Sequence, residues 1–400
     1  MPRSELTERI GRAAGTPAGG PDTSALWQRG RRRRRTKRLS SVAGVAAIVT
    51  AAVVAVPALD GVPRPVEIGP ADTPRVEQLP QVPLPNPATG PASLPTLEHT
   101  TDAQLVLTRD GVAHFVDVDR QHIETRRLSE LAAGDPPERL IVGDQLVLYG
   151  GATTYVMDPH PDAEVEPLTD QPPFSVFVDA GVPDRVWIRG GRTDNAPAEI
   201  LQIGLDGTVE LGPTLSPSGN LAVGLRNTVV LQRYDGLVVW DPAEDEILLT
   251  VDGPFPMGTD GHRFAWCDQP CQRLYLTDPT TGTTDLLAEL PDDASFAGYD
   301  GRISPDGRYL ATPICLDGDP RRCALTVLDL DHQRAWTVAD GHHEGYGKPA
   351  WSPDSRWVFI HLTDDRLAAY QPGRTEAEQL NIDPLPRPYG FGATPAPTNP

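Results

Sequence analysis

A unit consisting of an apolar strand followed by a turn recurs along this chain at intervals of 39, 48, 35, 37, 53 and 41 residues. Strand-like runs of four to seven residues lie between the turns, and apolar residues at helical spacing are nearly absent. In an all-β chain, a period of about 40 residues is typical of propeller blades with four strands each. Seven units therefore predict a seven-bladed β-propeller over 98–383. The turns lie at Asp119, Asp158, Asp206, Asp241, Asp278, Asp331 and Pro372, the last without aspartate.

A second pattern recurs one strand earlier in the unit. It contains Ser-Pro-Asp-Gly-Arg within 303–311 and Ser-Pro-Asp-Ser-Arg within 351–359, with weaker copies at 215–222 and 259–265. Proline presets φ, aspartate accepts local backbone hydrogen bonds and glycine takes positive φ, so the pattern predicts a tight hairpin between the innermost strand and the next. It resembles the propeller repeats of TolB and the WD-repeat-like propellers of prolyl oligopeptidases. This resemblance implies a fold and no particular activity, because propellers host unrelated activities.

The first unit shows three strands, at 104–108, 112–117 and 123–128, but no innermost strand. We expect the C-terminal run 389–393 to supply that strand and so to close the ring. The rest of 384–400 is a Pro-rich tail.

A basic run stands directly before 21 uncharged residues at 39–59. Because such a flank stays in the cytoplasm, residues 1–38 are predicted to be a cytoplasmic tail. The uncharged residues would form a helix of about 31 Å, long enough to cross a bilayer. Ten prolines then occupy 60–97, which is typical of an extended linker. These features predict a single-pass cell-membrane protein with an extracytoplasmic propeller; a cleaved signal peptide, ending near Ala58, is the alternative.

Charge divides the chain at about the same place. Residues 1–60 carry 11 basic and 4 acidic side chains, which leaves 24 basic and 51 acidic ones for the remainder. A net charge of −27 on the exported part repels nucleic acid, so no nucleic-acid partner is expected. The Asp-, Arg- and Pro-rich composition is of an actinobacterial type.

The four cysteines form two close pairs with turn residues between the partners. Cys267 pairs with Cys271, and Cys315 with Cys323, as two disulfide-closed hairpin loops in an oxidising compartment. Zinc is the competing interpretation, but the second spacing is not that of a usual zinc knuckle. The second pair falls in the longest interval of the repeat and should close an enlarged hairpin.

No linear catalytic or cofactor motif is found, so neither an enzyme nor a bound cofactor or metal is predicted. His342, His343 and Glu344 form a candidate ligand-facing loop just before an inner strand; adjacent histidines make it a poor metal site. The aspartate pairs 117/119 and 329/331 lack the rest of a calcium loop. Five tryptophans, about one per blade, are expected to pack between blades: Trp187, Trp240, Trp266, Trp336 and Trp357.

These observations favour a membrane-anchored binding or scaffold module for a protein or envelope ligand. One alternative is a hydrolase or lyase whose site lies in the central channel without a linear motif. Another is transmembrane signalling, in which residues 1–38 report on occupancy of the propeller.

Overall fold

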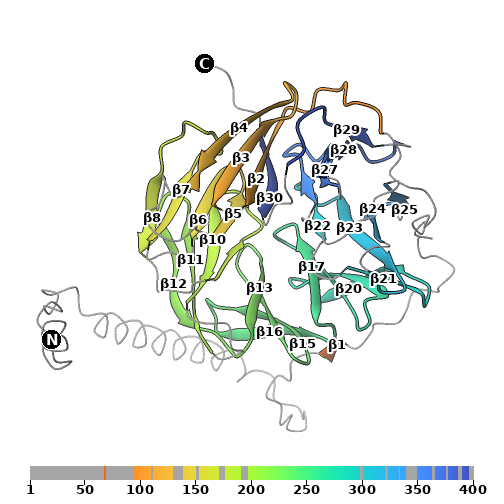
Figure 1. The fold of residues 1–400 in the computed structure, drawn as a ribbon. Coiled ribbons are helices and arrows are strands. Elements are labelled where there is room, and N and C mark those ends of the chain that lie inside the picture. Colours follow the sequence, from red (N-terminus) through yellow and green to blue (C-terminus); the bar gives the residue numbers. More distant parts are fainter. Residues whose placement is uncertain are drawn as a thin grey trace, which may run out of the picture. The chain divides into compact units, whose positions relative to one another are not determined.

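The structure is a computed structural model, and the elements of the residues it describes are strands arranged in seven sheets (Figure 1). The seven-bladed all-β propeller predicted from the repeat is therefore confirmed. Among the described residues no helix is long and apolar enough to cross a membrane. The structure describes residues 67–68, 94–109, 111–128, 138–149, 153–170, 176–190, 197–297, 301–319, 323–332, 334–338, 349–362, 365–374, 377–385 and 390–395.

Several predictions from the sequence fall outside these ranges. They are the cytoplasmic tail 1–38, the membrane span 39–59, most of the linker 60–97 and parts of the tail 384–400. They stay predictions.

Each blade is a meander of four antiparallel strands, which run in order from the inner to the outer edge. Short runs rich in valine, isoleucine and leucine form the strands, and turn residues separate them. Blade 1 contains β30 (Gly390–Pro395), β2 (Ala103–Arg109), β3 (Val112–Asp117) and β4 (His122–Arg127). Blade 2 contains β5 (Glu138–Val142), β6 (Gln145–Tyr149), β7 (Thr153–Met157) and β8 (Glu166–Asp170). Blade 3 contains β9 (Val176–Asp179), β10 (Arg185–Arg189), β11 (Glu199–Gly204) and β12 (Val209–Leu215).

The remaining four blades follow in chain order, and in blade 6 two short strands share the inner edge. Blade 4 contains β13 (Asn220–Gly224), β14 (Val229–Arg233), β15 (Gly236–Asp241) and β16 (Glu246–Val251), and blade 5 contains β17 (Phe255–Thr259), β18 (Phe264–Cys267), β19 (Arg273–Asp278) and β20 (Thr283–Glu289). Blade 6 contains the inner strands β21 (Ala294–Phe296) and β22 (Arg302–Ile303), followed by β23 (Tyr309–Leu316), β24 (Cys323–Asp329) and β25 (Arg334–Thr337). Blade 7 contains β26 (Ala350–Trp351), β27 (Val358–His361), β28 (Leu367–Tyr370) and β29 (Glu378–Gln379).

The two ends of the propeller meet in blade 1. Strand β30 pairs antiparallel with β2, from Ala103 opposite Pro395 to Thr108 opposite Gly390, and Figure 1 shows the dark blue strand beside the brown one. The prediction that the C-terminal run supplies the missing inner strand is confirmed. The inner strands then contact one another in ring order, from β30 through β5, β9, β13, β17, β22 and β26 back to β30.

The core is divided among the seven interfaces between neighbouring blades, each of which holds one hydrophobic cluster of buried side chains. Trp187 and Trp240 lie together between blades 3 and 4, and Trp266 lies between blades 4 and 5. Trp357 lies between blades 7 and 1, and Trp336 is half-buried beside the cluster of blades 6 and 7. The expected packing of tryptophans between blades is confirmed.

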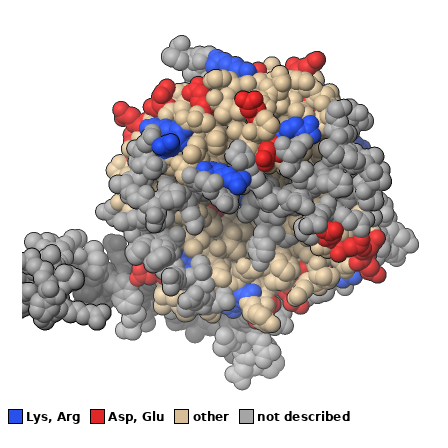
Figure 2. All heavy atoms as spheres, in the orientation of Figure 1, with Lys and Arg blue, Asp and Glu red and all other residues tan. Residues whose placement is uncertain are grey.

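Antiparallel pairing gives the propeller two distinct faces. The hairpins from inner to second strand and the turns from third to outer strand lie on one face, which we call the inner-hairpin face. The hairpins from second to third strand and the connections between blades lie on the other, which we call the disulfide face. In Figure 2, red acidic and blue basic side chains are interspersed around the face in view.

Extended segments from before blade 1 pair with two outer strands. Strand β1 (Glu67–Ile68) runs parallel to β16, and Leu97 bonds to Gln379 of β29 through its N–H (2.7 Å). Leu97 is buried in the cluster of blades 7 and 1. Beside it, Glu378 accepts hydrogen bonds from His99 (2.9 Å) and Arg374 (2.8 Å). The entering chain is thus fastened at the seam of the ring.

Candidate functional site

The Ser-Pro-Asp-Gly-Arg pattern builds the inner hairpin of blade 6, as predicted. The Ser304 hydroxyl donates to the Asp306 carboxylate (2.6 Å) and accepts from the N–H of Tyr309 (2.9 Å). Asp306 also accepts from the N–H of Arg308 (3.1 Å), and Gly307 takes the positive φ of 73°. Side chains thus satisfy the backbone groups that so tight a turn leaves unpaired.

The copy in blade 7 has the same geometry. Ser352 donates to Asp354 (2.6 Å) and accepts from the N–H of Trp357 (2.9 Å). Ser355 replaces the glycine at φ 63°, and its hydroxyl accepts a hydrogen bond from the N–H of Asp306 in blade 6 (3.0 Å). The inner hairpins of neighbouring blades are therefore joined directly.

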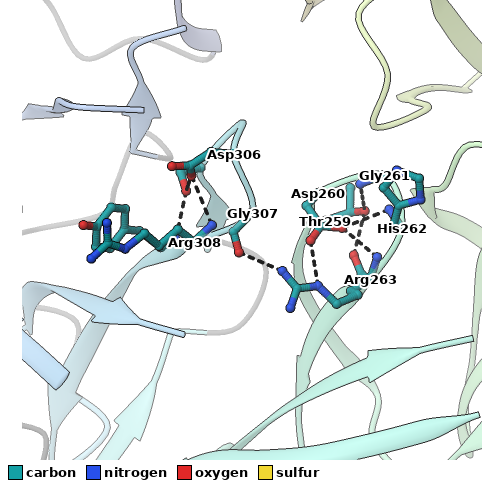
Figure 3. A network of polar contacts seen from close by, with 10 residues as sticks. Thr259, Asp260, Gly261, His262, Arg263, Asp306, Gly307 and Arg308 are labelled. Carbon is teal, nitrogen blue, oxygen red and sulfur yellow. Dashed lines mark hydrogen bonds and ion pairs between the residues drawn. The ribbon is translucent and has the colours of Figure 1, made fainter. Parts of the chain in front are cut away.

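Blade 5 extends this chain of links through the weak copy at 259–265, which forms the inner hairpin between β17 and β18 as predicted (Figure 3). Asp260 accepts from the N–H groups of His262 (2.9 Å) and Arg263 (2.6 Å) and from the Arg263 guanidinium (2.9 Å). The same guanidinium reaches across the blade boundary and donates to the carbonyl of Gly307 (2.8 Å). Arginine suits this position because its planar fork can serve two acceptors at once.

The prediction of an inner hairpin from the weak copy at 215–222 is wrong. Ser216 to Gly219 connect the outer strand of blade 3 to the inner strand of blade 4, on the disulfide face. The inner hairpin of blade 4 instead spans 225–228, where the N–H of Leu225 bonds to the carbonyl of Thr228 (2.9 Å). Serine, proline and glycine favour any sharp turn, so composition alone does not distinguish the two connections.

The aspartate turns join third and outer strands on the inner-hairpin face. In blade 1 the N–H of Arg120 in the turn donates to the Asp117 carboxylate (2.9 Å). Asp119 instead accepts a hydrogen bond from the N–H of Thr101 (2.6 Å), in the segment that enters blade 1. In blade 6 the capping residue is likewise Asp329, two residues before the predicted Asp331. Because aspartate occupies both positions of each pair, 117/119 and 329/331, the sequence alone does not show which of the two caps the turn. Asp206, Asp241 and Asp278 accept turn N–H groups as predicted.

Asp329 is also the centre of an ionic cluster. It is nearly buried and accepts from Arg308 (3.2 Å) and from the ring of His332 (3.1 Å). Burial opposes ionisation of this carboxyl, but the hydrogen bonds from His332 and Arg308 outweigh it and lower the pKa of Asp329. The cluster therefore stabilises the outer turn against the inner hairpin of the same blade.

A carboxyl group with a raised pKa, that of Asp179, lies at the inner edge of the ring. Asp179 ends the inner strand β9, and burial raises its pKa to about 6. The N–H of Gly181 (2.7 Å) and the charge of Arg302 act in the opposite direction. Because Arg302 belongs to the inner strand of blade 6, that charge acts across the ring. Asp179 belongs to no motif, so no pattern in the sequence singles it out.

Both predicted disulfides are present, on neighbouring blades and the same face. Cys267 and Cys271 close the middle hairpin of blade 5. Cys315 and Cys323 face each other across β23 and β24 of blade 6 and close its longer middle hairpin, as expected from the long repeat interval.

The candidate loop His342, His343 and Glu344 lies outside the described residues, between β25 and β26. Within the described ranges, no three histidine, cysteine, aspartate or glutamate side chains are grouped so as to hold a metal ion.

The fold and these faces define the chain as a seven-bladed β-propeller. No family model matches the sequence, and no curated protein matches it. Among solved structures it is similar to apo AztD from Citrobacter koseri, with 12% identity, a TM-score of 0.46, and coverage of 73% of this chain and 97% of that one. It is also similar to TolB from Acinetobacter baumannii, with 14% identity, a TM-score of 0.43, and coverage of 73% and 82%. The dihydro-heme d1 dehydrogenase NirN has 14% identity, a TM-score of 0.43, and coverage of 80% and 82%.

Proposed function

We propose that this protein is a membrane-anchored, extracytoplasmic β-propeller that binds a protein or envelope ligand through its disulfide face. The observation that carries the proposal is the pair of disulfide-closed hairpins, placed by blades 5 and 6 on that same face. Covalent closure preorganises a loop, and a preorganised loop loses less conformational entropy on binding.

The inner-hairpin face has a different role in this proposal. Its polar side chains bond to backbone groups of the neighbouring blade: the Arg263 guanidinium donates to the Gly307 carbonyl, and the Ser355 hydroxyl accepts from the N–H of Asp306. Such a network supports a rigid frame on which a binding face can be displayed. Disulfides also suit an oxidising compartment, which accords with export behind the predicted span 39–59.

Asp179 favours one further candidate, a hydrolase or lyase with its site at the centre of the ring. A carboxyl group with a pKa of about 6 can exchange protons near neutral pH, as general acid–base catalysis requires. A hydrolase or lyase activity that Asp179→Asn abolishes, while the protein stays folded, would establish this alternative in place of the scaffold.

The proposal is tested by placing a photo-crosslinking amino acid in the full-length protein in living cells. Position Gln269 is exposed in the disulfide-closed hairpin of blade 5, and Thr281 is exposed at the opposite end of the same blade. We expect one recurring adduct from 269 and none from the control at 281. Equal labelling at both positions, or none at 269, would refute a binding role for the disulfide face.

A further inference from the structure

The chain that enters blade 1 first joins the last blade at its outer edge. The N–H of Gln379 in β29 donates to the carbonyl of Pro95 (2.7 Å), and the N–H of Leu97 donates to the carbonyl of Gln379 (2.7 Å). Leu94 packs against the cluster of blades 6 and 7, whereas Leu97 is buried in that of blades 7 and 1. Backbone and core contacts therefore hold the segment 94–102, which we call the outer clasp.

One carboxylate binds the other end of the outer clasp to blade 1. Asp119 accepts hydrogen bonds from the N–H (2.6 Å) and the hydroxyl (2.9 Å) of Thr101 and from the N–H of Asp102 (3.0 Å). Hydrogen bonds to an ionised carboxylate are about twice as strong as those between neutral groups. Asp117 caps the adjacent turn, so the bonds of Asp119 serve the clasp.

Gln121 joins the outer clasp to the segment that leaves blade 7. Its side-chain amide donates to the carbonyl of Leu97 (3.1 Å), and its side-chain carbonyl accepts from the N–H of Asn381 (2.8 Å). Asn381 lies between β29 and β30, the strand that closes the ring. A single side chain thus contacts both the entering and the leaving ends of the propeller.

Two residues of this junction take the left-handed backbone conformation without being glycine. Asp102 has a φ of 49°, and Gln121 has a φ of 51°. Such conformations cost free energy and persist only where the surrounding contacts impose them. Release of the outer clasp frees Asp102 from Asp119 and breaks one of the two contacts of the Gln121 side chain, so part of this strain is relieved. The strain therefore offsets some of the contacts that release would lose.

The outer clasp runs directly into the strand that β30 pairs with. Asp102 precedes Ala103, the first residue of β2, and Ala103 lies opposite Pro395 of β30. We infer that the outer clasp couples the chain before the propeller to closure of the ring. A bound clasp holds β2 and the leaving segment in place for β30, and a released clasp loosens that pairing. Linkage makes the coupling reciprocal, so loosening β30 also loosens the clasp. The inference does not depend on what the disulfide face binds.

Hydrogen exchange of the full-length protein tests the coupling from the clasp to the closing strand. Asp119→Ala removes three hydrogen bonds from the outer clasp and leaves the turn cap of Asp117 in place. We expect the amides of β30 to exchange about tenfold faster in this variant, while those of β14 in blade 4 keep their rates. Asp241→Ala is the matched control, because it removes a turn cap far from the seam and should leave β30 unchanged.

A second variant tests the opposite direction. A Cβ atom on Gly392 of β30 would lie 2.4 Å from the side chain of Ile141, so Gly392→Val displaces β30 from its neighbour β5. The amides of 97–102 should then exchange about tenfold faster. Gly212→Val on β12 is the control, because a Cβ atom there meets open space.

The melting temperature shows whether each variant is folded, and Asp119→Asn, which keeps the shape of the side chain, replaces Asp119→Ala if the latter does not fold. Unchanged exchange of β30 in the folded Asp119 variant would show that the two ends of the propeller are independent. Unchanged exchange of 97–102 in Gly392→Val would overturn the inference as well. So would an equal acceleration in β14, because that result indicates a global loss of stability.

Discussion

Two glycines allow the inner hairpins of blades 3 and 5 to touch. A Cβ atom on Gly181 would lie 2.1 Å from the Cα of Gly261, and Gly181 also takes the positive φ of 67°. We therefore expect Gly181→Ala to lower the free energy of unfolding by about 2–4 kcal/mol, the sum of overpacking and backbone strain. Gly282→Ala is the matched control, because Gly282 has a similar φ of 71° and open space around it. Chemical denaturation of both variants measures the difference, and equal losses would argue against the contact between blades.

The raised pKa of Asp179 predicts how the stability of the protein depends on pH. Its pKa is about 6 in the folded protein and lies near 3.8 in the unfolded chain, so the folded state binds the proton more tightly. The contribution of Asp179 to stability is therefore greatest below pH 3.8 and is lost as pH rises through about 6. The change in the free energy of unfolding that Asp179→Asn causes should be more favourable at pH 7.5 than at pH 4, by on the order of 2 kcal/mol. Denaturation of both proteins at the two pH values checks this, and a difference independent of pH would contradict it.

Strand β30 is the element on which ring closure depends. Truncation after Asp383 removes the inner strand of blade 1 and exposes the edge of β2. We expect the melting temperature to fall by on the order of 10 °C, which corresponds to several kcal/mol for a domain of this size. Truncation after Pro395, which keeps β30, should melt like the full chain. If the protein ending at Asp383 melted no lower, closure by β30 would be disproved.

The middle hairpins of blades 5 and 6 allow a comparison between two elements. Replacing Cys315 and Cys323 by serine should cost roughly 2–3 kcal/mol, because the unfolded chain regains the entropy of an open loop. Replacing Cys267 and Cys271, which close a shorter loop, should cost no more than that. Denaturation with and without reductant measures both. Equal stability of the oxidised parent protein and the serine variants would show that the bridges add nothing to folding.

Elements with strong local patterns were predictable from the sequence. The apolar runs before Asp206, Asp241 and Asp278 fix strand and turn together, so the number of blades followed from their spacing. The C-terminal strand that closes the ring could be predicted because the sequence of blade 1 shows three strands and no innermost one. The position of the capping aspartate could not be predicted in the same way. Both Asp117 and Asp119 are residues that suit a turn, and only the structure shows that Asp117 caps it while Asp119 binds Thr101.

Features that depend on distances between blades were not predictable. The link from Arg263 to the carbonyl of Gly307 joins residues 44 positions apart and involves a backbone acceptor that no side-chain pattern reveals. Asp179 becomes unusual because folding partly buries its carboxyl group, which raises the pKa against the opposing charge of Arg302 in blade 6.

At the scale of the whole molecule, the surfaces of the propeller have separate roles. The inner-hairpin face joins blade to blade, and the disulfide face is proposed to bind a protein or envelope ligand. The net charge of −27 after residue 60 favours basic partners in general and disfavours self-association through like surfaces.

The most direct test of the central claim is in-cell cross-linking and capture of the full-length protein beside a version that lacks residues 1–38. A binding module outside the cytoplasm predicts the same exported or envelope partners with both proteins. Cytoplasmic partners that disappear with residues 1–38 would contradict it in favour of signalling, and capture of no partner by either protein would contradict it in favour of a small-molecule or enzymatic role.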